Sequence, residues 1–170
     1  MFFSRSDETN SYRPLLGFLL LTLVVGALAS VVTEPSIADW YARLLKPSFN
    51  PPNWLFAPVW TALYILMAIA AWRVWRSGQP SRTGQRGPIS IEIVLFLVQL
   101  AFNGAWSFIF FYAHRIAAAL VELGVLWLLI AATLVLFWRR DRIAGILLLP
   151  YLAWTGFAFV LNLAIWQLNR

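Results

Sequence analysis

The chain has 170 residues, of which 61% are hydrophobic and only 12% are charged. A soluble domain averages about 45–50% apolar and about 25% charged residues, so this composition indicates an integral membrane protein. The absence of cysteine excludes disulfides and Cys-ligated metals. A net charge of +6 is compatible with a nucleic-acid partner, but the basic residues flank apolar runs, which is the pattern that membrane topology produces and which argues against such a partner.

The first predicted element is a membrane-spanning helix. Residues 1–13 are polar and mixed in charge, and we interpret them as a mobile tail. Residues 14–32 carry no charge, and they span about 28 Å as a helix, close to a hydrocarbon core of roughly 30 Å. A cleaved signal peptide is the alternative, since Ala27, Leu28 and Ala29 resemble a cleavage site. The apolar run is longer than a usual signal core, which favours a retained helix.

The next stretch is unusual in proline and tryptophan. Residues 40–60 read WYARLLKPSFNPPNWLFAPVW, with four prolines and three tryptophans. This composition is too rich in proline for one helix and too aromatic for a flexible linker. We therefore predict that the first loop, residues 33–53, folds over an apolar partner and presents flat rings to it.

Four more apolar helices follow this loop, over about residues 54–76, 89–111, 116–138 and 143–168. Residues 77–88 form a basic loop rich in Gly, Pro and Ser between the first two of them. The predicted fold class is therefore an all-α integral membrane protein, a bundle of five transmembrane helices in one domain over residues 14–170.

The basic residues are unequally divided between the two ends of this bundle. Nine Lys and Arg fall on the side of the N-terminal tail, residues 73–86 and the 139–142 turn, and four fall on the other side. The positive-inside rule then predicts that the N-terminus and loop 77–88 are cytoplasmic. Loop 33–53 and the C-terminus are predicted outside, with a bacterial cell membrane as the host.

Alternating topology predicts that polar and aromatic residues of four helices lie at one depth. Counted from the outer helix ends, this depth is roughly 8–12 Å below the outer surface. The residues are Trp60, Asn103, Trp106, Glu122 and Asn162. The two amides serve either as interhelical hydrogen-bond partners or as ligand groups. Glu122 serves a ligand or a proton, or else it pairs with Arg115 or with an amide of the third helix.

Pairs of small residues predict close helix approaches. Gly26 with Ser30, and Ala101 with Ala105, have the spacing that brings helix backbones together. These pairs serve packing within the bundle or a homodimer. Ala101 and Ala105 lie off the face that carries Asn103, so the third helix is a candidate dimer face.

The sequence contains no catalytic constellation and no set of metal ligands at a typical spacing. We therefore assign no metal and no required cofactor. Trp54 and Trp166, near the ends of their spans, are interpreted as interface anchors.

Three segments carry a resemblance to a known family: WYARLLKPSFNPPNWLFAPVWTALY, QLAFNGAWSFIFF and LLLPYLAWTGFAFVLN. They resemble the TspO family of tryptophan-rich sensory proteins, which is similar to the mitochondrial translocator protein, or peripheral benzodiazepine receptor. The resemblance covers about residues 14–168. It implies a five-helix membrane protein, usually dimeric, that binds porphyrins such as protoporphyrin IX, and in some members sterols and benzodiazepine-type ligands.

The resemblance also implies a ligand pocket beneath the first loop. The matching positions are Trp40, Tyr41, Pro51, Trp60, Asn103, Trp106, Trp154, Ala158 and Leu161. Glu122 occupies a position that is often acidic in the family, and we include it among the ligand-binding residues. In similar proteins, tryptophans matching Trp60 and Trp154 are linked to light-dependent porphyrin breakdown.

Two departures from the family pattern bear on the ligand. Leu163 and Gln167 replace the Tyr and the basic residue of the sterol motif, which disfavours sterol binding by that route. Phe49 stands where relatives often have Trp. Three functions stay open: a porphyrin-binding sensor, an enzyme that degrades porphyrin in light and oxygen, and a carrier of tetrapyrroles or lipids. Arg43 and Lys46 either meet the propionates of a porphyrin or are ordinary solvated charges.

Overall fold

The computed structural model describes residues 5–78 and 90–170, with side chains described from residue 12 onward. The long helices are α1 (Arg5–Ser36), α2 (Phe56–Ser77), α3 (Ile91–Ser107), α4 (Ile116–Arg140) and α5 (Arg142–Leu168). Short helical turns cover Ile37–Tyr41, Asn53–Leu55 and Phe108–Tyr112. Within the described ranges there is no strand, and five helices are long and apolar enough to cross a membrane. The predicted fold class is confirmed.

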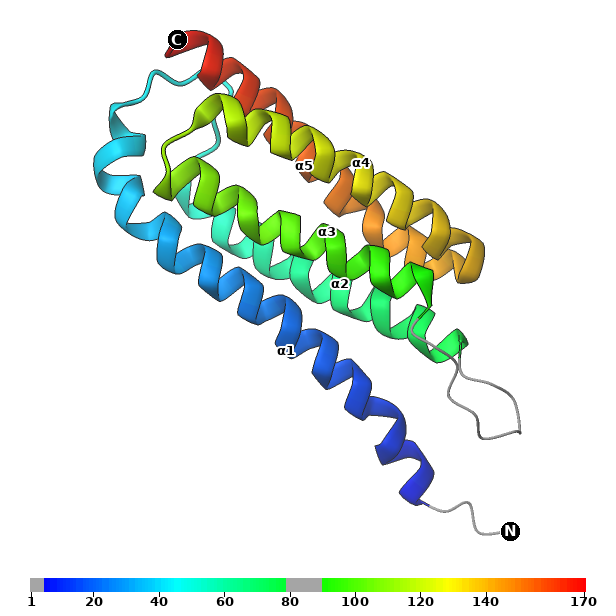
Figure 1. The fold of residues 1–170 in the computed structure, drawn as a ribbon. Coiled ribbons are helices and arrows are strands. Elements are labelled where there is room, and N and C mark those ends of the chain that lie inside the picture. Colours follow the sequence, from blue (N-terminus) through cyan, green and yellow to red (C-terminus); the bar gives the residue numbers. More distant parts are fainter. Residues whose placement is uncertain (1–4, 79–89) are drawn as a thin grey trace.

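The helices form one bundle in which α1 is the most peripheral member. It packs against α2 and α3, whereas α4 and α5 form an antiparallel pair on the other side (Figure 1). Most of the α1 surface is exposed, and its outward side chains are apolar, as expected for a helix that faces lipid. The start of α1 and the end of α5 lie at opposite ends of the bundle (Figure 1).

The first helix is longer than its apolar run predicts. It begins at Arg5, inside the predicted tail, and it continues past Pro35 to Ser36. The predicted loop 33–53 therefore starts as helix and continues as a π-helical turn over Ile37–Tyr41. Apolarity marks only the part of a helix that lies in hydrocarbon, and helical hydrogen bonds can extend beyond it into the polar region. Of the predicted loop 77–88, residues 79–88 lie outside the described residues.

Close contacts at small residues fix the register between α4 and α5. A Cβ atom on Gly145 would lie 2.8 Å from Trp138, one on Gly156 would lie 3.1 Å from the Trp127 indole, and one on Gly124 would lie 3.4 Å from Phe159. All three contacts follow one antiparallel register, in which each step along α4 matches one step back along α5. This register places position 161 opposite position 122.

The turn between α4 and α5 is locked to α2 by one carboxylate. Asp141 accepts a hydrogen bond from the Ala144 N–H at 3.1 Å and forms an ion pair with Arg73 at 2.9 Å. Burial raises the pKa of this carboxyl, but the Ala144 N–H and the Arg73 guanidinium lower it by more. The net pKa lies below the usual range of an aspartate, so the side chain stays ionised and keeps both partners.

Gly26 serves packing within the bundle, which is one of the two roles predicted for the pairs of small residues. A Cβ atom at Gly26 would lie 2.5 Å from the ring of Tyr64 on α2. Glycine therefore allows α1 to approach that ring directly. The other pair, Ala101 and Ala105, is exposed on α3 and remains available for a partner.

Candidate functional site

Residues 37–55, which we call the lid, close one end of the bundle. Ser36, directly before the lid, donates a hydrogen bond to the carbonyl of Phe111 at 2.8 Å. Within the lid, the Tyr41 hydroxyl donates to Asn50 Oδ1 at 2.8 Å. At the far side, Asn169 accepts from the Leu45 N–H at 3.0 Å and donates to the Leu45 carbonyl at 2.9 Å. The lid is thus attached at its far side to the end of α5, and the residue before it is attached to the turn that follows α3.

An aromatic cluster lies directly beneath the lid. Trp106 of α3 stacks on Phe110 at 5.0 Å, and Trp40 of the lid meets the same ring edge-on at 5.3 Å. Tyr41 is buried against Phe110 and Phe111, and Leu161 of α5 belongs to the same cluster. The structure therefore brings together the predicted residues Trp40, Tyr41, Trp106 and Leu161.

A residue that the sequence reasoning left unused holds Trp40 in place. His114, in the turn between α3 and α4, stacks on the Trp40 indole at 4.3 Å with an interplanar angle of 17°. Its φ of 54° lies in the left-handed region, which is uncommon outside glycine. A histidine in a short polar turn gives no sequence signal for such a contact, because the partner lies far away in the chain.

A second group of rings covers the side formed by α2 and α5. Trp154 meets Phe56 at 5.9 Å and Phe157 at 5.5 Å, and Phe49 of the lid reaches Phe157 at 6.4 Å. Phe49, which stands where relatives often have Trp, therefore still makes an aromatic contact. Two other predicted residues lie nearby in half-buried positions: Pro51 in the lid and Ala158 on α5.

A buried polar network lies deeper in the bundle and joins three helices. The Tyr64 hydroxyl donates to Asn103 Oδ1 at 2.7 Å, and Asn103 Nδ2 donates to the Tyr151 hydroxyl at 3.0 Å. Tyr151 in turn donates to Gln99 Oε1 at 2.9 Å. Trp60 lies beside this network, 5.7 Å from the Tyr64 ring and 6.3 Å from the Tyr151 ring. Asn103 therefore acts between helices, as the first alternative predicted.

Sequence reasoning missed the two tyrosines of this network. The available signal was their position, because a phenol in the middle of an apolar span needs a hydrogen-bond partner. Asn103 on the adjacent helix was the natural candidate. Both tyrosines are buried, Tyr151 completely.

The prediction of one common depth is wrong. Asn103 bonds to Tyr151, which lies about three turns, or roughly 16 Å, along α5 from Asn162. Depth was counted from the helix ends, but these ends are not level. Phe56 at the start of α2 contacts Trp154, whereas α5 continues past that level until Asn169 reaches the lid. Asn162 therefore lies near the lid, and Asn103 lies deeper.

Several buried polar atoms near the lid have no hydrogen-bond partner among the described residues. They are Trp106 Nε1, both oxygens of Glu122, and the amide nitrogen and oxygen of Asn162. The register of α4 and α5 places Glu122 opposite Leu161, next to Asn162 in the chain. The predicted pairing of Glu122 with Arg115 or with an amide of the third helix is wrong, because its carboxylate bonds to no described residue.

The two cations of the lid are engaged by the lid itself. Arg43 forms an ion pair with Asp39. The Lys46 ammonium donates to the carbonyls of Ala42 and Leu44 and lies 4.7 Å from the centre of the Tyr41 ring. Both cations therefore contact the lid, and their pairing with the propionates of a porphyrin stays a prediction. Among the residues described, no three His, Cys, Asp or Glu side chains are placed to hold a metal ion.

Five apolar helices, an aromatic interior and a proline-rich lid define a helical integral membrane protein. The chain belongs to the TspO/MBR family, whose model matches residues 18–167. The resemblance seen in the three sequence segments is thereby confirmed.

Named relatives come from distant organisms. The chain is 43% identical to the tryptophan-rich protein TspO of Chlorobaculum tepidum, covering 88% of this chain and 91% of the relative. It is 42% identical to protein CrtK of Rhodobacter capsulatus, covering 76% and 78%. It is 36% identical to the human translocator protein, covering 92% and 90%. The similarity therefore extends over nearly the whole chain, lid included.

Proposed function

We propose that this protein is a membrane receptor that binds porphyrins, such as protoporphyrin IX, beneath the lid and so regulates a tetrapyrrole or stress response. Its relatives are named as sensory and translocator proteins. The ligand lies between the rings around Trp106 and Phe110 and those around Trp154 and Phe157. Because the lid closes this end of the bundle, we expect it to move when the ligand enters.

The observation that carries this proposal is the group of unpartnered polar atoms among the aromatic rings. A buried polar atom without a partner costs about 1–3 kcal/mol. Glu122, Asn162 and Trp106 together supply both acceptors and donors at the lid end of the bundle. A porphyrin has a flat apolar ring, pyrrole N–H donors and acceptor nitrogens, so it suits both the rings and these atoms.

The proposal predicts opposite changes in stability and affinity when the polar atoms are removed. In Glu122→Leu/Asn162→Leu, we expect the affinity for protoporphyrin IX to fall about tenfold, equivalent to about 1.4 kcal/mol. Thermal stability should be unchanged or higher, since unpartnered polar groups are replaced by apolar ones. Both are measurable on purified protein, by tryptophan quenching during porphyrin titration and by thermal unfolding.

Thr133→Val is the matched control for this variant. It also removes a buried polar atom from α4, but one that bonds to the Leu129 carbonyl at 2.7 Å, far from the lid. We expect its porphyrin affinity to equal that of the wild type. Equal affinities in the wild type and the double variant would contradict the assignment of Glu122 and Asn162 to the ligand.

A second candidate function is the light- and oxygen-dependent degradation of the porphyrin. It is favoured by the position of Trp60 beside two phenols, Tyr64 and Tyr151, since these oxidisable rings form a contiguous group. Illumination of the protein with protoporphyrin IX discriminates the two functions. If the protein degrades porphyrin, the wild type should bleach the Soret band faster than the Trp60→Phe/Trp154→Phe variant does. Equal bleaching rates would exclude the enzyme and favour a receptor or a carrier.

The orientation and assembly are also proposals. The unequal basic residues favour a cytoplasmic N-terminus and an outward-facing lid in a bacterial cell membrane. The exposed Ala101 and Ala105 of α3 are a suitable face for a homodimer. Cross-linking of single cysteines introduced at these two positions tests the dimer, and a purely monomeric product would exclude this face.

A further inference from the structure

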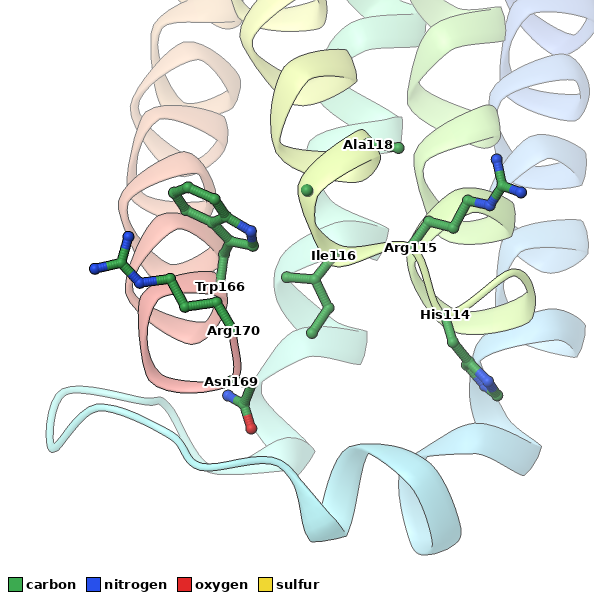
Figure 2. A pocket seen from close by; sticks show the side chains of 8 residues that line it. His114, Arg115, Ile116, Ala118, Trp166, Asn169 and Arg170 are labelled. Atoms are coloured by element: carbon green, nitrogen blue, oxygen red, sulfur yellow. The ribbon is translucent and has the colours of Figure 1, made fainter.

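An open pocket of about 420 Å³ lies at the lid end of the bundle, on the outer surface. It is formed by the first turn of α4 and the last turn of α5, and it borders the ring cluster beneath the lid through His114 and Ile116. Ala117 and Ala118 have the smallest side chains that line it (Figure 2). The hollow exists because these short side chains stand beside the large side chains of Trp166 and Arg170.

The pocket is cationic. Arg115 and Arg170 line it from opposite sides of the first turn of α4, with their guanidiniums directed away from each other (Figure 2). The His114 ring points toward the lid, where it stacks on Trp40. No Asp or Glu is among the lining residues. In the part of the chain that the structure describes, neither guanidinium has a carboxylate partner. The Arg170 guanidinium lies 5.6 Å from the centre of the Trp166 ring, which holds it at the pocket.

An apolar stripe continues from the pocket along α4. Val121, Val125 and Leu128 follow at helical spacing and are 70%, 42% and 64% exposed. These side chains face lipid in a membrane, while the arginines and Trp166 lie at the helix ends, where the headgroups are. The surface therefore has a positive part at the lid end and an apolar part nearer the membrane centre, which are the two parts of a phospholipid in the same order.

We propose that the pocket between the start of α4 and the end of α5 binds an anionic phospholipid. Its headgroup lies over Ala117 and Ala118, in the pocket that Arg115 flanks on one side and Arg170 on the other, and one acyl chain lies along Val121, Val125 and Leu128. Guanidinium groups match phosphate oxygens in geometry as well as charge. Basic pockets between transmembrane helices bind anionic headgroups for this reason. This site is distinct from the porphyrin site, although His114 and Asn169 line it and also contact the lid.

The test is the thermal stability of the purified full-length protein in micelles, titrated with phosphatidylglycerol or with phosphatidylcholine of the same acyl chains. A ligand that binds the folded state raises the unfolding temperature. We expect phosphatidylglycerol to raise it by several degrees and phosphatidylcholine to have little effect. In Arg115→Gln/Arg170→Gln, the apparent affinity for phosphatidylglycerol should fall about 25-fold, since each basic residue near the surface contributes roughly a factor of five.

Arg43→Gln/Lys46→Gln is the matched control, because it removes two positive charges from the lid at the same end of the bundle. It should keep the full response to phosphatidylglycerol. An equal loss in both double variants would mean general charge attraction and would overturn the site. Inorganic phosphate that reproduces the stabilisation in wild-type protein would identify a free-anion site instead of a lipid site.

Fluorescence gives a second readout that does not depend on stability. Brominated phosphatidylglycerol at low mole fraction should quench the Trp166 share of the emission, obtained as the difference between wild type and Trp166→Phe. Brominated phosphatidylcholine at the same mole fraction should quench this share much less. Equal quenching by the two lipids would show that Trp166 meets only bulk lipid, and the proposal would then be wrong.

Discussion

Replacing Trp106 and Trp154 together by alanine is expected to lower the affinity for protoporphyrin IX about 100-fold. The two indoles lie in the two aromatic groups between which the ligand is proposed to bind, stacked on Phe110 and packed against Phe157. An aromatic pair contributes about 0.5–1.5 kcal/mol beyond the area it buries, and the lost area adds to this. Two rings therefore account for about 2.8 kcal/mol, or two factors of ten.

The measurement is a porphyrin titration of purified protein, followed by the porphyrin absorbance so that the missing tryptophans do not affect the signal. Trp54→Ala is the control for loss of a tryptophan, because Trp54 is 73% exposed and touches neither group of rings. It should bind as the wild type does. Trp106→Phe/Trp154→Phe keeps a flat ring at both positions and should retain most of the affinity. Wild-type affinity in the double alanine variant would mean that the ligand binds elsewhere.

The second large effect is on stability and concerns the buried network at Asn103. Asn103→Leu leaves the Tyr64 hydroxyl without its acceptor and the Tyr151 oxygen without its donor. A buried hydroxyl without a partner costs about 1–3 kcal/mol, so we expect the free energy of unfolding to fall by about 2 kcal/mol. Reversible unfolding of the protein in mixed micelles measures this change.

A double-mutant cycle separates the hydrogen bond from a general packing defect. Tyr64→Phe removes the donor, so adding it to Asn103→Leu should cost much less than it costs in the wild type. Asn53→Leu and Tyr112→Phe are matched surface controls, since both residues are exposed, and they should change stability by less than about 0.5 kcal/mol. If the losses in free energy of unfolding caused by Asn103→Leu and Tyr64→Phe were strictly additive, the hydrogen bond between these two side chains would be contradicted.

These two expectations divide the interior into two levels with different roles. The deeper level, around Asn103, joins α2, α3 and α5 through a chain of four hydrogen-bonded side chains, in which Gln99 Nε2 alone lacks a partner among the described residues. The level beneath the lid contains the unpartnered atoms of Glu122, Asn162 and Trp106. A protein that binds a ligand keeps polar groups available at the site at some cost in stability, and that asymmetry distinguishes the lid end from the deeper level.

The lid shows which part of the site could be predicted. Its prolines and rings indicated a segment folded over apolar partners, and Tyr41 is indeed buried against Phe110 and Phe111. The partners of its charges could not be predicted. Arg43 and Lys46 were candidates for propionates, yet both are engaged within the lid itself. Such short-range contacts depend on the path of an irregular backbone, for which the sequence has no periodic signal.

The sequence alone determined the membrane-spanning helices and the family, because hydropathy and length act locally against a bilayer of fixed thickness. The family motifs also singled out Trp40, Tyr41, Trp106 and Leu161, which the structure brings together beneath the lid. Only the tertiary structure decided which polar atoms meet. Asn103 bonds to Tyr64 and Tyr151, whereas Glu122 bonds to no described residue. These pairings depend on helix rotation, tilt and register, which are set by close contacts such as those at Gly26 and Gly145.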